Sequence, residues 1–208
     1  ASKLRIRDLQ FIPMSALKGD MIVTRGDRMP WYRGYTFLDY LENLHVASDR
    51  NLLDFRFPIQ MVLRPDARFR GYAGQIEGGI IKKGDDVVIL PSGKKTTIRS
   101  VMMDEKELPY AFGPQSVVLT LNDEVDAGRG DMMVRQHNLP EVANEFEAAL
   151  CWLSDEPLSP QKIYHLKQTT KNVRGFVSTL RYKINIDTLH REPTQQLALN
   201  EIGRVYVK

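Results

Sequence analysis

The strongest indication of the fold comes from a Gly-rich stretch, Arg70-Gly71-Tyr72-Ala73-Gly74-Gln75-Ile76-Glu77-Gly78-Gly79-Ile80-Ile81-Lys82-Lys83-Gly84-Asp85-Asp86-Val87-Val88-Ile89. Gly71 and Gly74 allow neighbouring backbones to approach closely, and Gly78-Gly79 supplies the positive φ of a tight hairpin turn. Gly84-Asp85 supplies the next turn, and a Val-rich run follows it. These features predict a β-meander.

The sequence on either side extends this β pattern. Over residues 55–63 apolar side chains recur at every second position, as in a strand with one buried face, and Pro58 predicts that this strand lies near a sheet edge. A second strand-rich unit follows Asn138-Leu139-Pro140, with strands expected over residues 146–153, 162–168, 175–186 and 203–207. Because both units are short and all-β, we expect two antiparallel barrels in tandem, at 49–138 and 139–208.

Residues 1–48 do not follow the barrel pattern. Residues 9–12 predict a short strand, and residues 13–20 predict a loop. Thr36 and Asp39 have the spacing of a capping box, and the next turns carry an apolar stripe at helical spacing. Its members are Phe37, Leu38, Leu41 and Leu44. A helix is therefore expected before the first barrel.

The Gly-rich stretch resembles the signature of the second domain of translational GTPases such as elongation factor Tu. Residues 11–20, 29–34 and 45–51 narrow the resemblance to the large, GTP-binding subunit of the heteromeric bacterial sulfate adenylyltransferase, and residues 199–205 resemble its closing strand pair. The resemblance implies that residues 1–48 are the C-terminal remnant of a P-loop GTPase domain, with its last strand and helix. The two barrels would then correspond to domains 2 and 3 of elongation factor Tu.

The same resemblance implies a function. The parent subunit hydrolyses GTP, with magnesium, and drives a catalytic small subunit that makes adenosine 5'-phosphosulfate and pyrophosphate from ATP and sulfate. In the complete GTPase domain, Ser15, Ala16 and Leu17 would approach the guanine base. The expected partners of this chain are that small subunit and the rest of the GTPase domain. The alternative is a pair of barrels from a translation-type GTPase that bind RNA or the ribosome.

The motifs of GTP hydrolysis are absent from the sequence. Neither the phosphate-binding GxxxxGK[ST] nor the metal-side DxxG occurs, and Asn51-Leu52-Leu53-Asp54 lacks the Lys of NKxD and follows Ser15 where it should precede it. The four histidines are scattered, without metal-ligand spacing or a nucleophile beside them. We expect no catalytic residue, no metal site and no cofactor held by this chain alone.

The charge of the chain is unevenly distributed. The net charge is only +3, but residues 157–186 contain no Asp or Glu. This basic window holds Lys162, Lys167, Lys171, Arg174, Arg181 and Lys183, which form a candidate partner-contact face. A solvated strand face, an acidic protein partner and nucleic acid all remain open as explanations, although nucleic acid is the least favoured because few aromatic residues are interleaved.

The remaining composition suggests an ordinary globular protein. No apolar run approaches the ~20 residues that cross a bilayer, and residues 1–5 lack the apolar stretch of a signal peptide, so a cytoplasmic location without membrane contact is expected. The single Cys151 lies in an apolar run and is expected to fill a core.

Overall fold

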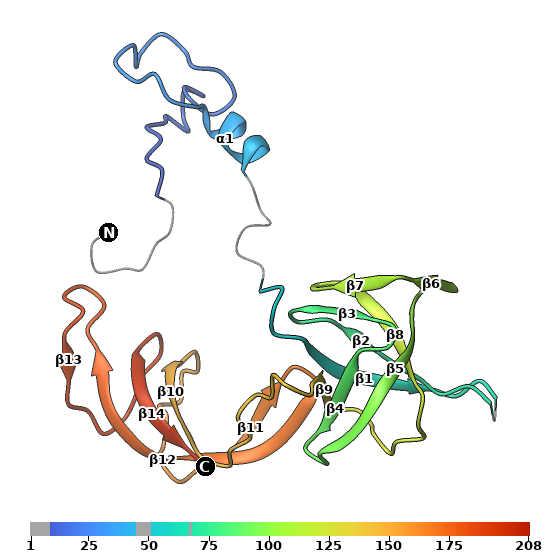
Figure 1. Ribbon diagram of the computed structural model, residues 1–208. Helices are drawn as coiled ribbons and strands as arrows, with labels where there is room; N and C mark the ends of the chain where they lie inside the picture. The colour runs from blue at the N-terminus through green and yellow to red at the C-terminus, as the bar shows by residue number, and fades with distance from the viewer. Residues whose placement is uncertain (1–8, 45–50, 67) are drawn as a thin grey trace. The chain divides into compact units, whose positions relative to one another are not determined.

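Figure 1 shows the computed structural model, which describes residues 9–44, 51–66 and 68–208. The chain is mainly β and divides into two compact units, residues 1–50 and 51–208. Part of the expected 45–51 motif therefore lies outside the described residues. Among the described residues, no helix is both long enough and apolar enough to span a bilayer.

The first unit contains the helix α1 (Phe37–Asn43). Its capping box forms as the sequence predicts, because the Asp39 amide donates to Thr36 Oγ1 at 3.2 Å and the Thr36 amide donates to Asp39 Oδ2 at 3.4 Å. No strand forms over residues 9–12, because a strand needs a hydrogen-bonded neighbour and the described part of this unit offers only single bridges, Ser15↔Asp20 and Asp20↔Thr24.

The first barrel is built from the strands of the Gly-rich stretch and those on either side of it. Its strands are β1 (Arg56–Leu63), β2 (Gly71–Gln75), β3 (Ile80–Lys82), β4 (Asp86–Leu90), β5 (Lys94–Met103), β6 (Lys106–Leu108), β7 (Tyr110–Phe112), β8 (Ser116–Leu121) and β9 (Met132–Arg135). The main sheet has the order β4-β9-β1-β2-β8-β5-β6, and β4 also pairs with β5. This extra pairing closes six strands into a ring (Figure 1).

Inward-facing side chains fill this ring. Phe57 and Ile59 on β1, Tyr72 on β2 and Leu119 on β8 are all buried within a continuous core. The Tyr72 hydroxyl donates to the Val125 carbonyl oxygen at 2.5 Å, so its polar atom is satisfied. Because burial disfavours the charged phenolate, the pKa of Tyr72 is raised.

Two glycines of the Gly-rich stretch allow other parts of the backbone to approach closely. A Cβ at Gly74 would collide with the Pro58 carbonyl oxygen, and Gly79 has φ +75° and packs against the Phe55 backbone. The edge position predicted from Pro58 is wrong, since β1 lies between β9 and β2. Proline is tolerated there because the β1–β2 register starts at Ile59↔Gly74 and makes no use of an N–H at position 58.

The second sheet follows in the order β10-β14-β12-β11, with β13 paired to β12. Its strands are β10 (Phe146–Cys151), β11 (Ile163–Gln168), β12 (Lys171–Ile184), β13 (Arg191–Glu192) and β14 (Ile202–Val207). The four strands expected from the sequence all form. The core is small, with buried Leu158, Val177, Leu197, Val205 and Val207.

Candidate functional site

The predicted guanine-side loop is a solvent-facing turn. The Ser15 amide donates to the Asp20 carbonyl oxygen at 3.1 Å, and the Gly19 amide closes the turn on the Ser15 carbonyl oxygen at 2.8 Å. Ala16 and Leu17 are exposed, and their amides donate to no acceptor among the described residues. Two adjacent free N–H groups can bind one oxygen of a ligand, which is the contact that the sequence predicts for a guanine base.

The basic window divides into paired and unpaired residues. Lys162 Nζ lies 2.7 Å from Glu156 Oε1, and Lys183 Nζ lies 2.6 Å from Glu201 Oε1. These hydrogen bonds raise the pKa of both lysines, and the Lys183 contact lowers the pKa of Glu201. Both lysines are therefore already paired with carboxylates of this part of the chain.

Arg181 is also paired, through a carboxylate that it shares. Arg181 Nη1 donates to Glu147 Oε1 at 2.6 Å, and Arg204 Nη2 donates to Glu147 Oε2 at 3.2 Å. The hydrogen bonds from Arg204 and Arg181 lower the pKa of Glu147 to about 2. This cluster ties β10, β12 and β14 together rather than offering a free cation.

The remaining cations lie on the hairpin formed by β11 and β12. Lys167, Lys171 and Arg174 form no ion pair with any acidic residue in the described part of the chain. The strand register places His165 opposite Arg174 and Lys167 opposite Asn172. Since alternate residues share a face, His165, Lys167 and Arg174 project from the same side of the hairpin, and all three are exposed. We call these three residues the hairpin patch.

The segment Asn51–Asp54, which shares its outer residues with NKxD, forms hydrogen bonds within the first barrel. Asn51 Oδ1 accepts hydrogen bonds from the Leu53 and Asp54 amides at 3.0 Å, and Asn138 Nδ2 donates to Asp54 Oδ1 at 2.6 Å. This network joins the beginning of the first barrel to its end, and the hydrogen bonds from Asn51 and Asn138 lower the pKa of Asp54. The sequence Asn51–Asp54 is thus a turn motif within the barrel.

The expectation that Cys151 fills a core is wrong. The thiol is exposed, because Cys151 is the last residue of β10 and its alternation places it away from the buried face. Within the described residues, no group of three or more His, Cys, Asp or Glu side chains is arranged to hold a metal ion.

Sequence reasoning missed a groove on the outer face of the first barrel. Cross-strand pairs Met61↔Ala73, Ala73↔Val118 and Val118↔Met102 set one apolar row across four neighbouring strands. The small Ala73 and the short Val118 lie between the two long methionines, and all four line a hollow of about 570 Å³. No sequence signal unites these residues, because each comes from a different strand.

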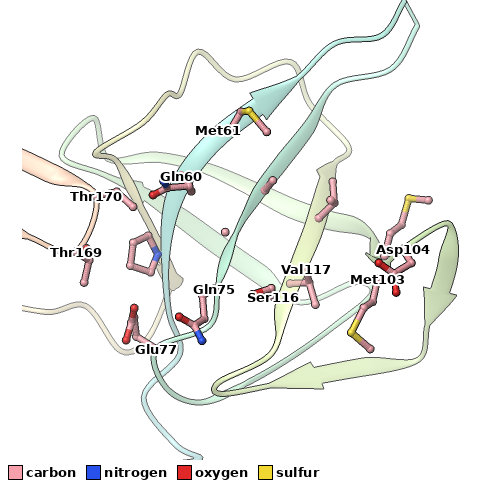
Figure 2. Close-up of a pocket in the computed structure, with 15 residues that line it drawn as sticks. Gln60, Met61, Gln75, Glu77, Met103, Asp104, Ser116, Val117, Thr169 and Thr170 are labelled. Atoms are coloured by element: carbon pink, nitrogen blue, oxygen red, sulfur yellow. The ribbon is translucent and has the colours of Figure 1, made fainter.

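The ends of this groove are polar. Figure 2 shows Glu77, Thr169 and Thr170 at one end and Met103 with Asp104 at the other. Both carboxylates are exposed and neither forms an ion pair with a described residue. Among the described residues, the lining contains no Lys, Arg or His.

Comparisons with known proteins identify the fold and the relatives. Residues 145–208 match the family model described as GTP-eEF1A C-terminal domain-like. The solved structure of Sup35 complexed with GDP superposes with a TM-score of 0.68 at 19% identity, over 97% of this chain and 50% of that one. Sup35 complexed with GMPPNP gives a TM-score of 0.64. The fold is therefore that of the C-terminal β domains of translation-factor GTPases.

The sequence relatives are more specific. The chain is 48% identical over 205 residues to the bifunctional enzyme CysN/CysC of Rhodopirellula baltica, covering 99% of this chain and 32% of that relative. It is also 48% identical to sulfate adenylyltransferase subunit 1 of Bacteroides fragilis, over 97% of this chain and 42% of that relative. The curated homologues of this chain are thus sulfate adenylyltransferase subunit 1 and CysN, and the chain spans less than half of their length.

Proposed function

We propose that this chain carries the β domains of the regulatory GTPase subunit of sulfate adenylyltransferase in sulfate assimilation. In that role GTP hydrolysis is coupled to the reaction of ATP with sulfate, which yields adenosine 5'-phosphosulfate and pyrophosphate. The observation that carries the proposal is the 48% identity to a sulfate adenylyltransferase subunit 1 over 97% of the chain.

GTP binding would require more of the protein than these residues. The free amides of Ala16 and Leu17 fit the guanine oxygen, and Ser15 fixes the turn that presents them. The phosphate loop and the magnesium ligands would come from the part of the relatives that this chain does not span. The 208 residues alone should therefore bind GTP weakly and hydrolyse none.

The apolar stripe of α1 supports the same assignment. No residue of the helix is buried, and Phe37, Leu38, Leu41 and Leu44 are between 38% and 47% exposed. An amphipathic helix of two turns is not stable in water unless its apolar face is covered. The proposed cover is the remaining part of the GTPase domain.

The hairpin patch is the proposed docking face for the catalytic small subunit. Its cations form no ion pair with a described residue, whereas Lys162, Arg181 and Lys183 are already paired. An acidic surface on the partner would neutralise Lys167 and Arg174 and make the association sensitive to salt. When GTP moves the domains of the subunit, rigid β units of this kind would transmit the movement to the partner in the cytoplasm.

The test is a binding titration of this chain with the purified small catalytic subunit. The expected result is a complex that weakens with salt and weakens further in the Lys167→Glu/Arg174→Glu variant. The matched control is Lys162→Gln, which removes a cation of the same window that is already paired. Its effect on binding should be small.

The alternative function is RNA or ribosome binding by translation-type barrels, and the hairpin patch is the observation that favours it. Transfer RNA replaces the small subunit in the same titration. Binding of tRNA with a steep loss of affinity between low and moderate salt, together with no binding of the small subunit, would reject the sulfurylase assignment in favour of this alternative.

A further inference from the structure

We infer that the outer groove of the first barrel is a docking site for an extended segment of another protein, one that carries an apolar side chain next to a Lys or Arg. The site lies on the β1-β2-β8-β5 face, with the turn of the β11–β12 hairpin at one end. It shares no residue with the hairpin patch and does not rest on the GTPase assignment. Its chemistry follows from three observations: the shape of its floor, the charge of its rim, and the strain of the segments at its ends.

The floor of the groove fits one apolar side chain. The row Met61, Ala73, Val118 and Met102 crosses four strands in continuous register, with its two small members in the middle. Met61 is 53% exposed although it is a large apolar residue. Flexible methionines beside a small floor suit a surface that adapts to an inserted aliphatic side chain. The β1–β2 register shifts between Ile59 and Met61, as at a β-bulge, so the pairing of β1 is irregular beside the groove.

The rim of the groove selects the charge of the occupant. Glu77 and Asp104 lie at opposite ends (Figure 2), and no basic side chain lines the groove in the part of the chain that the structure describes. The unpaired cations of the hairpin, including Lys167 and Lys171, are not part of the lining. A nucleic acid would bring phosphates with nothing in the groove to neutralise them. A segment with a Lys or Arg beside its apolar anchor complements both carboxylates.

The segments at the two ends of the groove contain residues with positive φ and a buried hydroxyl that lacks a hydrogen-bond partner among the described residues. Thr169 has φ +50°, which is a rare conformation for a β-branched residue, and Asp104 has φ +48°. Thr170 Oγ1 is buried and has no hydrogen-bond partner among the described residues. The Gln75 side chain donates to the Pro114 carbonyl oxygen at 2.9 Å, which leaves its own oxygen free to accept from a bound backbone. Polar groups are thus available beside the apolar floor for a peptide main chain.

The experiment uses the 208-residue chain labelled with ¹⁵N and three capped pentapeptides as probes. The first is acetyl-Gly-Lys-Leu-Lys-Gly-amide, the second replaces both lysines with Glu, and the third replaces Leu with Gly. The dinucleotide CpA is the fourth probe. Amide chemical shifts are followed in a titration at low salt.

The first peptide should bind with a Kd of about 1 mM, as expected for one anchored side chain, and should shift the amides of Ala73, Val118 and Met102. The other two peptides should bind at least about fivefold more weakly, because each lacks one half of the complementarity. Equal shifts with all three peptides, shifts outside the groove, no shifts with any peptide, or tighter binding of CpA would each overturn the inference.

Two exposed-residue variants separate the site from general charge. Glu77→Gln/Asp104→Asn removes both rim carboxylates, and Asn tolerates the left-handed conformation at position 104. This variant should weaken the Lys-Leu-Lys peptide about fivefold or more. Glu105→Gln removes the neighbouring carboxylate, which does not line the groove, and should leave the Kd unchanged. An equal loss in both variants would show that the attraction is not specific to the groove.

Discussion

Replacing Leu197 with Ala should strongly destabilise the second sheet and leave the stability of the first barrel unchanged. Leu197 is completely buried and is one of only five buried residues in its core. A buried Leu→Ala change costs about 2–5 kcal/mol, while a folding unit of roughly 60 residues is stable by about 3–9 kcal/mol in all. The loss is therefore a large part of the stability of this unit, and with a urea m-value of about 1 kcal/mol/M the midpoint should fall by about 2 M or more.

Trp152 provides the assay, because it packs edge-on to Tyr164 in the second sheet at 5.6 Å between ring centroids. The chain has two tryptophans, so a Trp31→Phe background leaves Trp152 as the only one. Its emission is followed in urea for the parent and for Leu197→Ala. Leu153→Ala is the matched control, since Leu153 is 74% exposed and its loss should change stability by no more than about 0.5 kcal/mol.

Hydrogen exchange of the first barrel completes the test. The amides of Ile89 and Leu119, in its core strands, should stay protected in Leu197→Ala while those of β14 (Ile202–Val207) exchange. Simultaneous loss of protection in both regions would show that the two cores unfold as one cooperative unit. An unchanged midpoint would show that Leu197 does not support the second core. The same data test the boundary expected near residue 138.

Three further predictions test individual contacts. The pKa of Glu147 lies below its ordinary value, so the stability that its ion pairs contribute is present above pH about 4.5 and is lost as the pH falls towards 2. The thermal unfolding midpoint should therefore drop over this pH range. The Glu147→Gln variant should show a smaller drop. Gly79→Ala should lower the thermal midpoint by several degrees, because the added Cβ would meet the Phe55 backbone. Gly84→Ala, at φ +83° with open space around it, should lower the midpoint less. Equal losses in the two variants would contradict the steric explanation. Leu41→Ser should change the stability of this chain by under about 0.5 kcal/mol, because Leu41 is exposed here. The same change should destabilise the full-length subunit, in which the GTPase domain is proposed to cover α1. An equal loss of stability in the two proteins would contradict that proposal.

Much of the fold follows from local sequence chemistry. The glycines at 74 and 79 are required where backbones approach or φ is positive, and the capping box at Thr36 fixes the start of α1. The strands of both β units follow from alternation and turn residues. The edge position predicted for the strand that contains Pro58 is wrong. Whether a strand lies at a sheet edge depends on which other strands pair with it, and its own sequence does not specify them.

The site features were harder to predict than the strands. The basic window of the sequence does not show which of its six cations form ion pairs. Arg181 pairs with Glu147 and Lys183 with Glu201, and both carboxylates come from outside the window. The Met61–Met102 row likewise exists only through the register of four strands. Cys151 is exposed because it ends a strand, although its neighbours in sequence are apolar. Long-range pairing, which sequence alone does not specify, decided the ion pairs of Glu147 and Glu201 and the Met61–Met102 row.

The proposal that these β domains connect the GTP state to the catalytic subunit is tested most directly in the full-length GTPase subunit carrying Lys167→Glu/Arg174→Glu. The measurement is adenosine 5'-phosphosulfate formation by the reconstituted enzyme with and without GTP, alongside GTP hydrolysis. We predict normal intrinsic GTP hydrolysis by the isolated variant subunit and loss of GTP-dependent stimulation of product formation. Undiminished stimulation in the variant would contradict docking through the hairpin patch.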